Sequence, residues 1–131
     1  MTRIRRMLLL AGGLAMAAAV PAPAHHSGAM FDESRTVTFE GVIREMQWTN
    51  PHSWLLVDVT GDDGTVTTWG FEAEGPSTLR RAGIRPADLR AGAAITITGR
   101  PMKDGRPAAL WVSAVLADGR TLDPRKGFEV R

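Results

Sequence analysis

Cysteine is absent from the 131 residues of this chain. Its absence excludes a disulfide scaffold, a thiolate metal site and a cysteine nucleophile. Motifs that mark common catalytic sites are missing as well. No serine lies in a nucleophile-elbow glycine pattern, and neither an HExxH pair nor a phosphate-cradling glycine loop occurs. We therefore expect a protein that is not an enzyme.

The chain also lacks a strong excess of either charge, with 16 Lys and Arg against 14 Asp and Glu. Residues 1–24 hold three arginines and no acid. The other 107 residues therefore carry 13 basic and 14 acidic side chains, a formal net charge of −1. Nucleic-acid binding depends on clustered Lys and Arg that neutralise phosphates. We expect no nucleic-acid partner.

Residues 1–24 have the layout of a secretory signal peptide. A basic start precedes an apolar run from Met7 to Val20, and Ala22-Pro23-Ala24 provides the small residues of a cleavage site. The apolar run of about 14 residues is shorter than the roughly 20 needed to cross a bilayer. We expect the segment to be removed, leaving no stable membrane anchor and a periplasmic protein that begins at His25.

From Arg35 onward, apolar and polar residues alternate with the period of two that marks half-buried strands. A parity change after Gly41 predicts a bulge or sharp coil in the first strand. On the last strand the alternation places Leu110, Val112, Ala114 and Leu116 on one face, and on the third strand Glu72 and Glu74 are expected on a solvated face. The predicted strands span 35–48, 54–59, 65–73, 94–99 and 110–116, and a short helix runs from Ser77 to Ala82.

Three strands, a short helix and two strands, with a long bent first strand, predict an all-β fold with one short helix. The order is that of a small five-stranded OB-like barrel with the helix between strands three and four. A β-sandwich is the alternative, although it would usually need about seven strands. The predicted organisation is a signal peptide at 1–24, an N-terminal tail at 25–34, a barrel domain at 35–121 and a C-terminal tail at 122–131.

The three histidines fall in two places, His25 and His26 at the expected mature N-terminus and His52 after the first strand. An N-terminal histidine offers its α-amine and imidazole as a chelate, and both lose their protons readily to a competing metal. Copper(II) favours such nitrogen ligands, and zinc(II) binds them less strongly. We predict a copper(II) site of His25, His26 and His52, for which the tail must fold back across the barrel. Alternatively, His25 and His26 simply follow the cleavage site.

A second candidate site is the segment from Trp48 to Trp54, in which two indoles flank a turn with polar side chains. In OB-type barrels the loop between the first two strands borders the ligand face. The segment therefore predicts a module that binds a periplasmic protein partner or a small ligand through Trp48, Asn50, His52 and Trp54. In the alternative interpretation, Asn50 and Pro51 only make the turn, and the tryptophans cover the end of the barrel.

Several short motifs recur in the same order in a family of small exported bacterial proteins of unknown function, which this sequence resembles. The motifs are Ala24-His25-His26-Ser27, Trp48-Thr49-Asn50-Pro51-His52, Trp69-Gly70-Phe71-Glu72, the pair Gly92 and Gly99, and Asp118-Gly119-Arg120. The resemblance covers essentially the whole mature chain. It implies export and a single domain, and it supplies no activity, substrate or cofactor.

Overall fold

The computed structural model describes residues 27–126, so the predicted signal peptide, His25 and His26 lie outside the described residues. Six strands are present in this part: β1 Val37–Gln47, β2 His52–Thr60, β3 Val66–Glu74, β4 Ala94–Pro101, β5 Ala108–Leu116 and β6 Thr121–Leu122. The helical elements are the 3₁₀ turns η1 Ser27–Met30 and η2 Pro86–Asp88, and the α-helix α1 Pro76–Arg81. No helix in residues 27–126 is long and apolar enough to cross a membrane.

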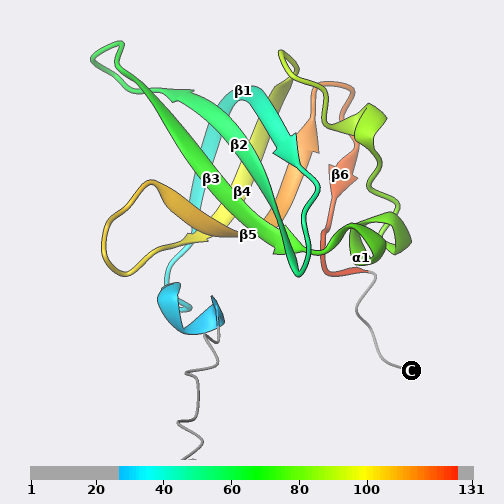
Figure 1. The fold of residues 1–131 in the computed structure, drawn as a ribbon. Coiled ribbons are helices and arrows are strands. Elements are labelled where there is room, and N and C mark those ends of the chain that lie inside the picture. The colour runs from blue at the N-terminus through cyan, green and yellow to red at the C-terminus, as the bar shows by residue number, and fades with distance from the viewer. Residues whose placement is uncertain (1–26, 127–131) are drawn as a thin grey trace, which may run out of the picture.

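The first five strands close into a barrel (Figure 1). Antiparallel pairing gives the order β3-β2-β1-β4-β5, and parallel pairing of β3 with β5, with Glu72 opposite Leu110, joins the two ends. α1 lies between β3 and β4 in the chain, where the OB-like layout requires it. The predicted all-β fold, a five-stranded OB-like barrel with one short helix between strands three and four, is confirmed.

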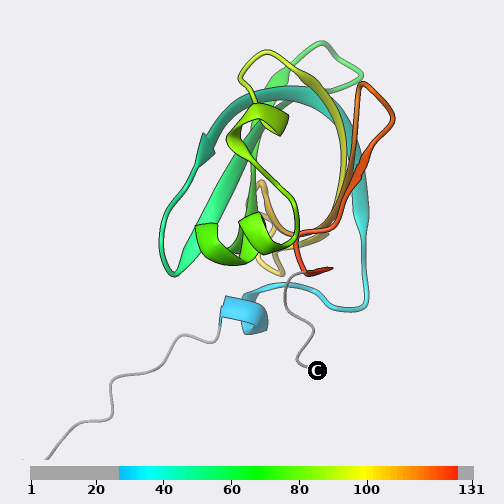
Figure 2. The same ribbon diagram turned by 90° about the vertical axis from the view of Figure 1, so that its right-hand side faces the viewer.

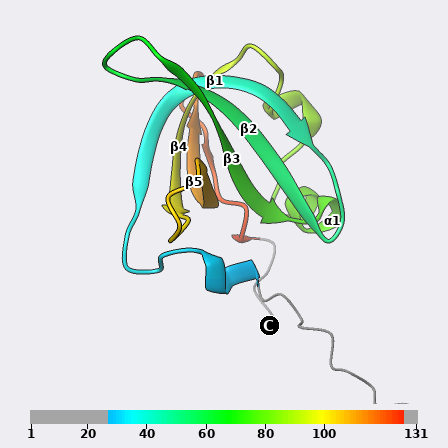
Figure 3. The same cartoon turned by 60° about the vertical axis from the view of Figure 1, so that its left-hand side comes forward.

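β1 arches over the barrel, and its two ends point toward the same side (Figure 3). Its register against β2 shifts between Ile43 and Glu45, which is the bulge that the parity change predicts. Gly41 precedes the bulge, and a Cβ there would lie 2.6 Å from Val57 Cγ1 and 2.7 Å from the Asp58 carbonyl oxygen. The backbones can approach this closely only because residue 41 has no side chain.

The barrel interior is filled by inward-facing apolar side chains, including Leu55 and Val57 on the predicted inner face of β2. Leu79 of α1 and Ile84 after it are fully buried, so the helical segment covers one end of the core. Gly83 ends the helix with a φ of 83°, a conformation that residues with a Cβ rarely adopt. The predicted helix is therefore a plug at the end of the barrel.

The prediction of which residues of β5 face the core is wrong for the first half of the strand. Register against β4 shifts so that Gly99 pairs with Trp111 and Thr98 with Ser113, which leaves Val112 as an extra residue. Trp111 is therefore buried before the bulge, whereas Leu110 and Val112 are only partly buried. A strict alternation cannot continue through a bulge, because the extra residue inverts which side chains face the core.

The packed domain extends beyond the predicted limits of 35–121 at both ends. Leu122 and Pro124, predicted to lie in the C-terminal tail, are buried, and Leu122 belongs to β6. Phe31, predicted to lie in the N-terminal tail, is fully buried and bridges to Met102. Single apolar residues in short polar segments have no periodicity, so pattern analysis assigns them to tails.

Candidate functional site

The turn from β1 to β2 is fixed by local contacts that place His52 at the start of β2. The Thr49 hydroxyl donates a hydrogen bond of 2.6 Å to the His52 carbonyl oxygen, and the Ser53 hydroxyl donates one of 3.3 Å to the Thr49 carbonyl oxygen. Gly75 packs beside the turn, where a Cβ would lie only 2.7 Å from Asn50 Oδ1. These contacts fix the backbone of the turn, and with it the point on the barrel from which the His52 side chain extends.

His52 contacts a buried carboxylate. Its Nδ1 lies 2.9 Å from Glu72 Oε1, and the side chains are 35% and 3% exposed, respectively. No hydrogen bond of acceptable geometry reaches Oε1 in the described part of the chain. The two atoms are therefore in close contact without hydrogen-bond geometry. Nδ1 faces the carboxylate, and Nε2 is the ring nitrogen on the far side.

Glu72 is buried although it lies on the outer face of the barrel, where the sequence predicts a solvated face. Trp54 of β2 and Leu110 of β5 are its register neighbours on either side, and both are partly buried. Glu74, two residues further along β3, keeps more of its surface exposed. Sequence reasoning missed Glu72 because the burial depends on neighbours from two other strands.

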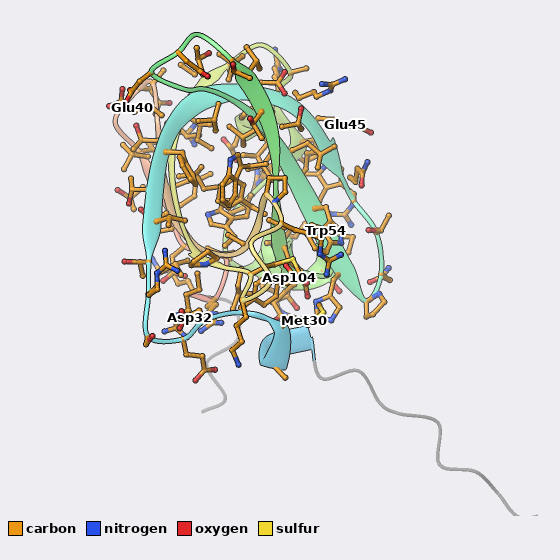
Figure 4. All side chains as sticks on the ribbon, turned by 90° about the vertical axis from the view of Figure 1, so that its left-hand side faces the viewer. Met30, Asp32, Glu40, Glu45, Trp54 and Asp104 are labelled. Carbon is orange, nitrogen blue, oxygen red and sulfur yellow. The ribbon has the colours of Figure 1, made fainter. Side chains whose placement is uncertain are left out.

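The two tryptophans of the predicted loop site lie in different environments. Trp48 packs partly against the hydrophobic core, as expected if it covers the barrel. Trp54 lies against Gly70, where a Cβ would be 3.3 Å from its Cε3 atom, and is beside Glu72 in register. Asn50 is exposed in the turn. Figure 4 shows Trp54 on the same side of the barrel as Asp104 of the β4–β5 loop and Met30 of η1.

The segment before β1 is attached to the β4–β5 connection. The Asp32 amide donates to the Pro101 carbonyl oxygen at 2.8 Å, and the Lys103 amide donates to the Met30 carbonyl oxygen at 3.0 Å. Lys103 Nζ donates to the Ala29 carbonyl oxygen at 3.0 Å. Because β1 arches, η1 lies at the barrel end that also carries the β1–β2 turn (Figures 1 and 3). The arch of β1, rather than a reversal of the segment before it, sets η1 at this end.

The described residues alone do not form a metal site. Within 27–126 no group of three or more His, Asp or Glu side chains is placed to hold an ion. His52 is the one histidine among these residues. Further nitrogen donors would have to come from His25 and His26, the two histidines that lie outside the described residues.

Fold and site define a small OB-like β-barrel with a partly exposed histidine against a buried glutamate. The chain belongs to a family described as a family of unknown function (DUF6152), whose model matches residues 14–111. No curated protein and no solved structure matches the chain. The family assignment confirms the resemblance to an uncharacterised family, whereas the signal, mature start and turn motifs remain predictions.

Proposed function

We propose that this protein is an exported, non-enzymatic metal-binding protein that holds one ion, copper(II) in preference to zinc(II). The ligands are His52 and, from the mature N-terminus, His25 and His26. The observation that carries the proposal is the contact between His52 Nδ1 and the buried Glu72 carboxylate.

Metal-binding histidines usually direct their second ring nitrogen at a carboxylate or a carbonyl oxygen, which fixes the tautomer and makes the ligating nitrogen more basic. Glu72 lies in the corresponding place, with Oε1 2.9 Å from His52 Nδ1, so Nε2 is the nitrogen left to bind the ion. A buried carboxylate without a full set of hydrogen bonds is costly. A cation on the far side of the imidazole offsets part of that cost, which supports metal binding at this position.

The position of η1 supports the participation of the N-terminal histidines. Ser27 begins η1 at the same barrel end as the β1–β2 turn, and His25 is two residues before it. Each residue extends the chain by at most about 3.6 Å. The chain therefore allows His25 and His26 a reach of at most about 7 Å from the start of η1, at the barrel end that carries the β1–β2 turn. Copper(II) accepts such nitrogen donors in tetragonal geometry.

Export and processing should leave His25 as the first residue. The cleavage motif at Ala22-Pro23-Ala24 and the short apolar run are the reasons. The measurement is the intact mass of the protein recovered from the periplasm after expression of the full chain. A mature chain that starts at any other residue would remove the α-amine from His25 and contradict the copper site in this form.

Copper titration of the mature protein tests the function directly. We expect one copper(II) ion per chain, bound more tightly at pH 7.5 than at pH 5 because protons compete for amine and imidazole. One residue added before His25 should weaken binding at least tenfold, since it moves the amine away from the imidazole. The His52→Ala variant should also weaken it. Isothermal titration calorimetry is the measurement.

The matched control carries one added residue after Arg131, which lengthens the chain equally and leaves the N-terminal amine in place. Its affinity should equal that of the unmodified protein. Equal affinity with and without the residue before His25 would contradict the chelate. An unchanged copper affinity in the His52→Ala variant would show that the barrel supplies no ligand.

Binding of a protein partner or small ligand is the second candidate function. Trp54 favours it, because its indole lies on the outer face of β2 and β3, which OB-type barrels use for ligands. Trp54→Ala should abolish such binding, and its copper affinity should fall less than that of Glu72→Gln, because the carboxylate that faces His52 is kept. A large loss of copper affinity in this variant would show that the indole belongs to the metal site.

A further inference from the structure

The net charge of the domain is near zero, but its basic and acidic side chains are unevenly distributed. Residues 80–92 and 117–126 together hold seven basic and three acidic side chains, a formal charge of +4. The rest of residues 27–126 hold five basic and ten acidic side chains, a formal charge of −5. One part of the domain is therefore strongly basic although the whole is not.

The basic segments form one face, which Figure 2 views from the front with α1 and η2 nearest the viewer. Four exposed arginines give this face its charge. Arg80 and Arg81 end α1, and Arg85 and Arg90 flank η2. We call the surface formed by these four residues the arginine face. Two of the four are not on a helix, so stabilising a helix dipole does not account for the set.

The acidic side chains of residues 80–92 and 117–126 already have partners within these two segments. Arg120 binds Asp88 and Asp118 with its guanidinium, each at 2.8 Å. Hydrogen bonds from the Arg120 backbone and guanidinium hold the pKa of Asp118 below its usual value. Asp123 accepts a hydrogen bond from the Arg125 amide. Among the described residues, none of the four arginines of the arginine face forms a salt bridge.

We infer that the arginine face binds the phosphate-bearing surface of an anionic phospholipid membrane. The planar guanidinium matches phosphate oxygens with two parallel hydrogen bonds, and all four residues are arginine. No aromatic side chain occurs in 80–92 or 117–126, so the face has nothing on which to stack the bases of a single-stranded nucleic acid. Peripheral binding to headgroups fits the charge and the lack of exposed large apolar side chains in these two segments. The inference does not depend on metal binding.

Vesicle co-sedimentation of the mature protein tests the inference. Binding is expected to phosphatidylglycerol–phosphatidylcholine vesicles at low salt, with loss at 0.5 M salt and no binding to phosphatidylcholine alone. Each arginine near such a surface contributes roughly fivefold in affinity. The double variants R80Q/R81Q and R85Q/R90Q should therefore each lose roughly 25-fold.

The matched control is R44Q/R106Q, which removes two exposed arginines from the acidic part and changes the net charge equally. It should change vesicle binding less than threefold. Equal losses in all three variants would show a response to net charge and overturn the inference. So would binding to duplex or single-stranded DNA without binding to vesicles. Circular dichroism checks folding, and R80K/R81K, which keeps the charge but not the paired hydrogen bonds, should bind more tightly than R80Q/R81Q and less tightly than the unaltered protein.

Discussion

Replacing Trp111 with Ala is expected to lower the free energy of unfolding by about 3–5 kcal/mol. Trp111 is 1% exposed and lies on β5, the strand that pairs with both β4 and β3 to close the barrel. Its indole Nε1 has no hydrogen-bond partner among residues 27–126, so truncation removes packing without breaking a polar contact. The cost is the lost burial and the cavity left behind. Urea denaturation followed by circular dichroism measures it.

Trp54→Ala is the control for this prediction, because Trp54 is half-buried on the outer face and its removal opens no internal cavity. It should cost clearly less than Trp111→Ala. The unaltered protein should stay folded in excess chelator without urea, since an apolar core rather than a metal closes the barrel. Equal costs for the two tryptophans, or unfolding by chelator, would contradict this description of the core.

Replacing Glu72 with Gln is expected to weaken copper(II) binding by roughly 10- to 100-fold while the protein stays folded. The substitution keeps the shape of the side chain and removes the charge that lies 2.9 Å from His52 Nδ1. The amide keeps an oxygen that can accept from Nδ1 but carries no negative charge, so it stabilises a cation bound at Nε2 less well. Stability should change little or rise, because an imperfectly paired buried charge is lost. Calorimetric titration and urea denaturation give the two quantities.

Glu74→Gln is the matched control, since it removes the same charge from the same strand. Glu74 is the register partner of His52 but is more exposed than Glu72 and makes no salt bridge among the described residues. Its copper affinity should fall less than threefold. Equal losses in the two variants would mean that only the general negative potential matters, and the positioning role of Glu72 would be wrong.

Local pattern is sufficient for most of the elements of this fold. The period of two sets the strands, and Leu55 and Val57 face the core as their spacing predicts. The parity change after Gly41 indicates the bulge of β1, and Gly83 ends the helix where a glycine is expected. Each of these depends on residues a few positions apart, and the order of elements then restricts the topology to an OB-like barrel. The sequence also confines the histidines to two places.

Tertiary structure alone decided the features that build the candidate site. Glu72 is buried because Trp54 and Leu110, from strands 18 and 38 residues away, lie on either side of it. The arch of β1 sets η1 and the β1–β2 turn at one end of the barrel, and the bulge at Val112 turns Trp111 into the core. None of this is a local property. Burial and proximity depend on which strands become neighbours, and a side chain of fixed type is exposed or buried according to what is packed across from it.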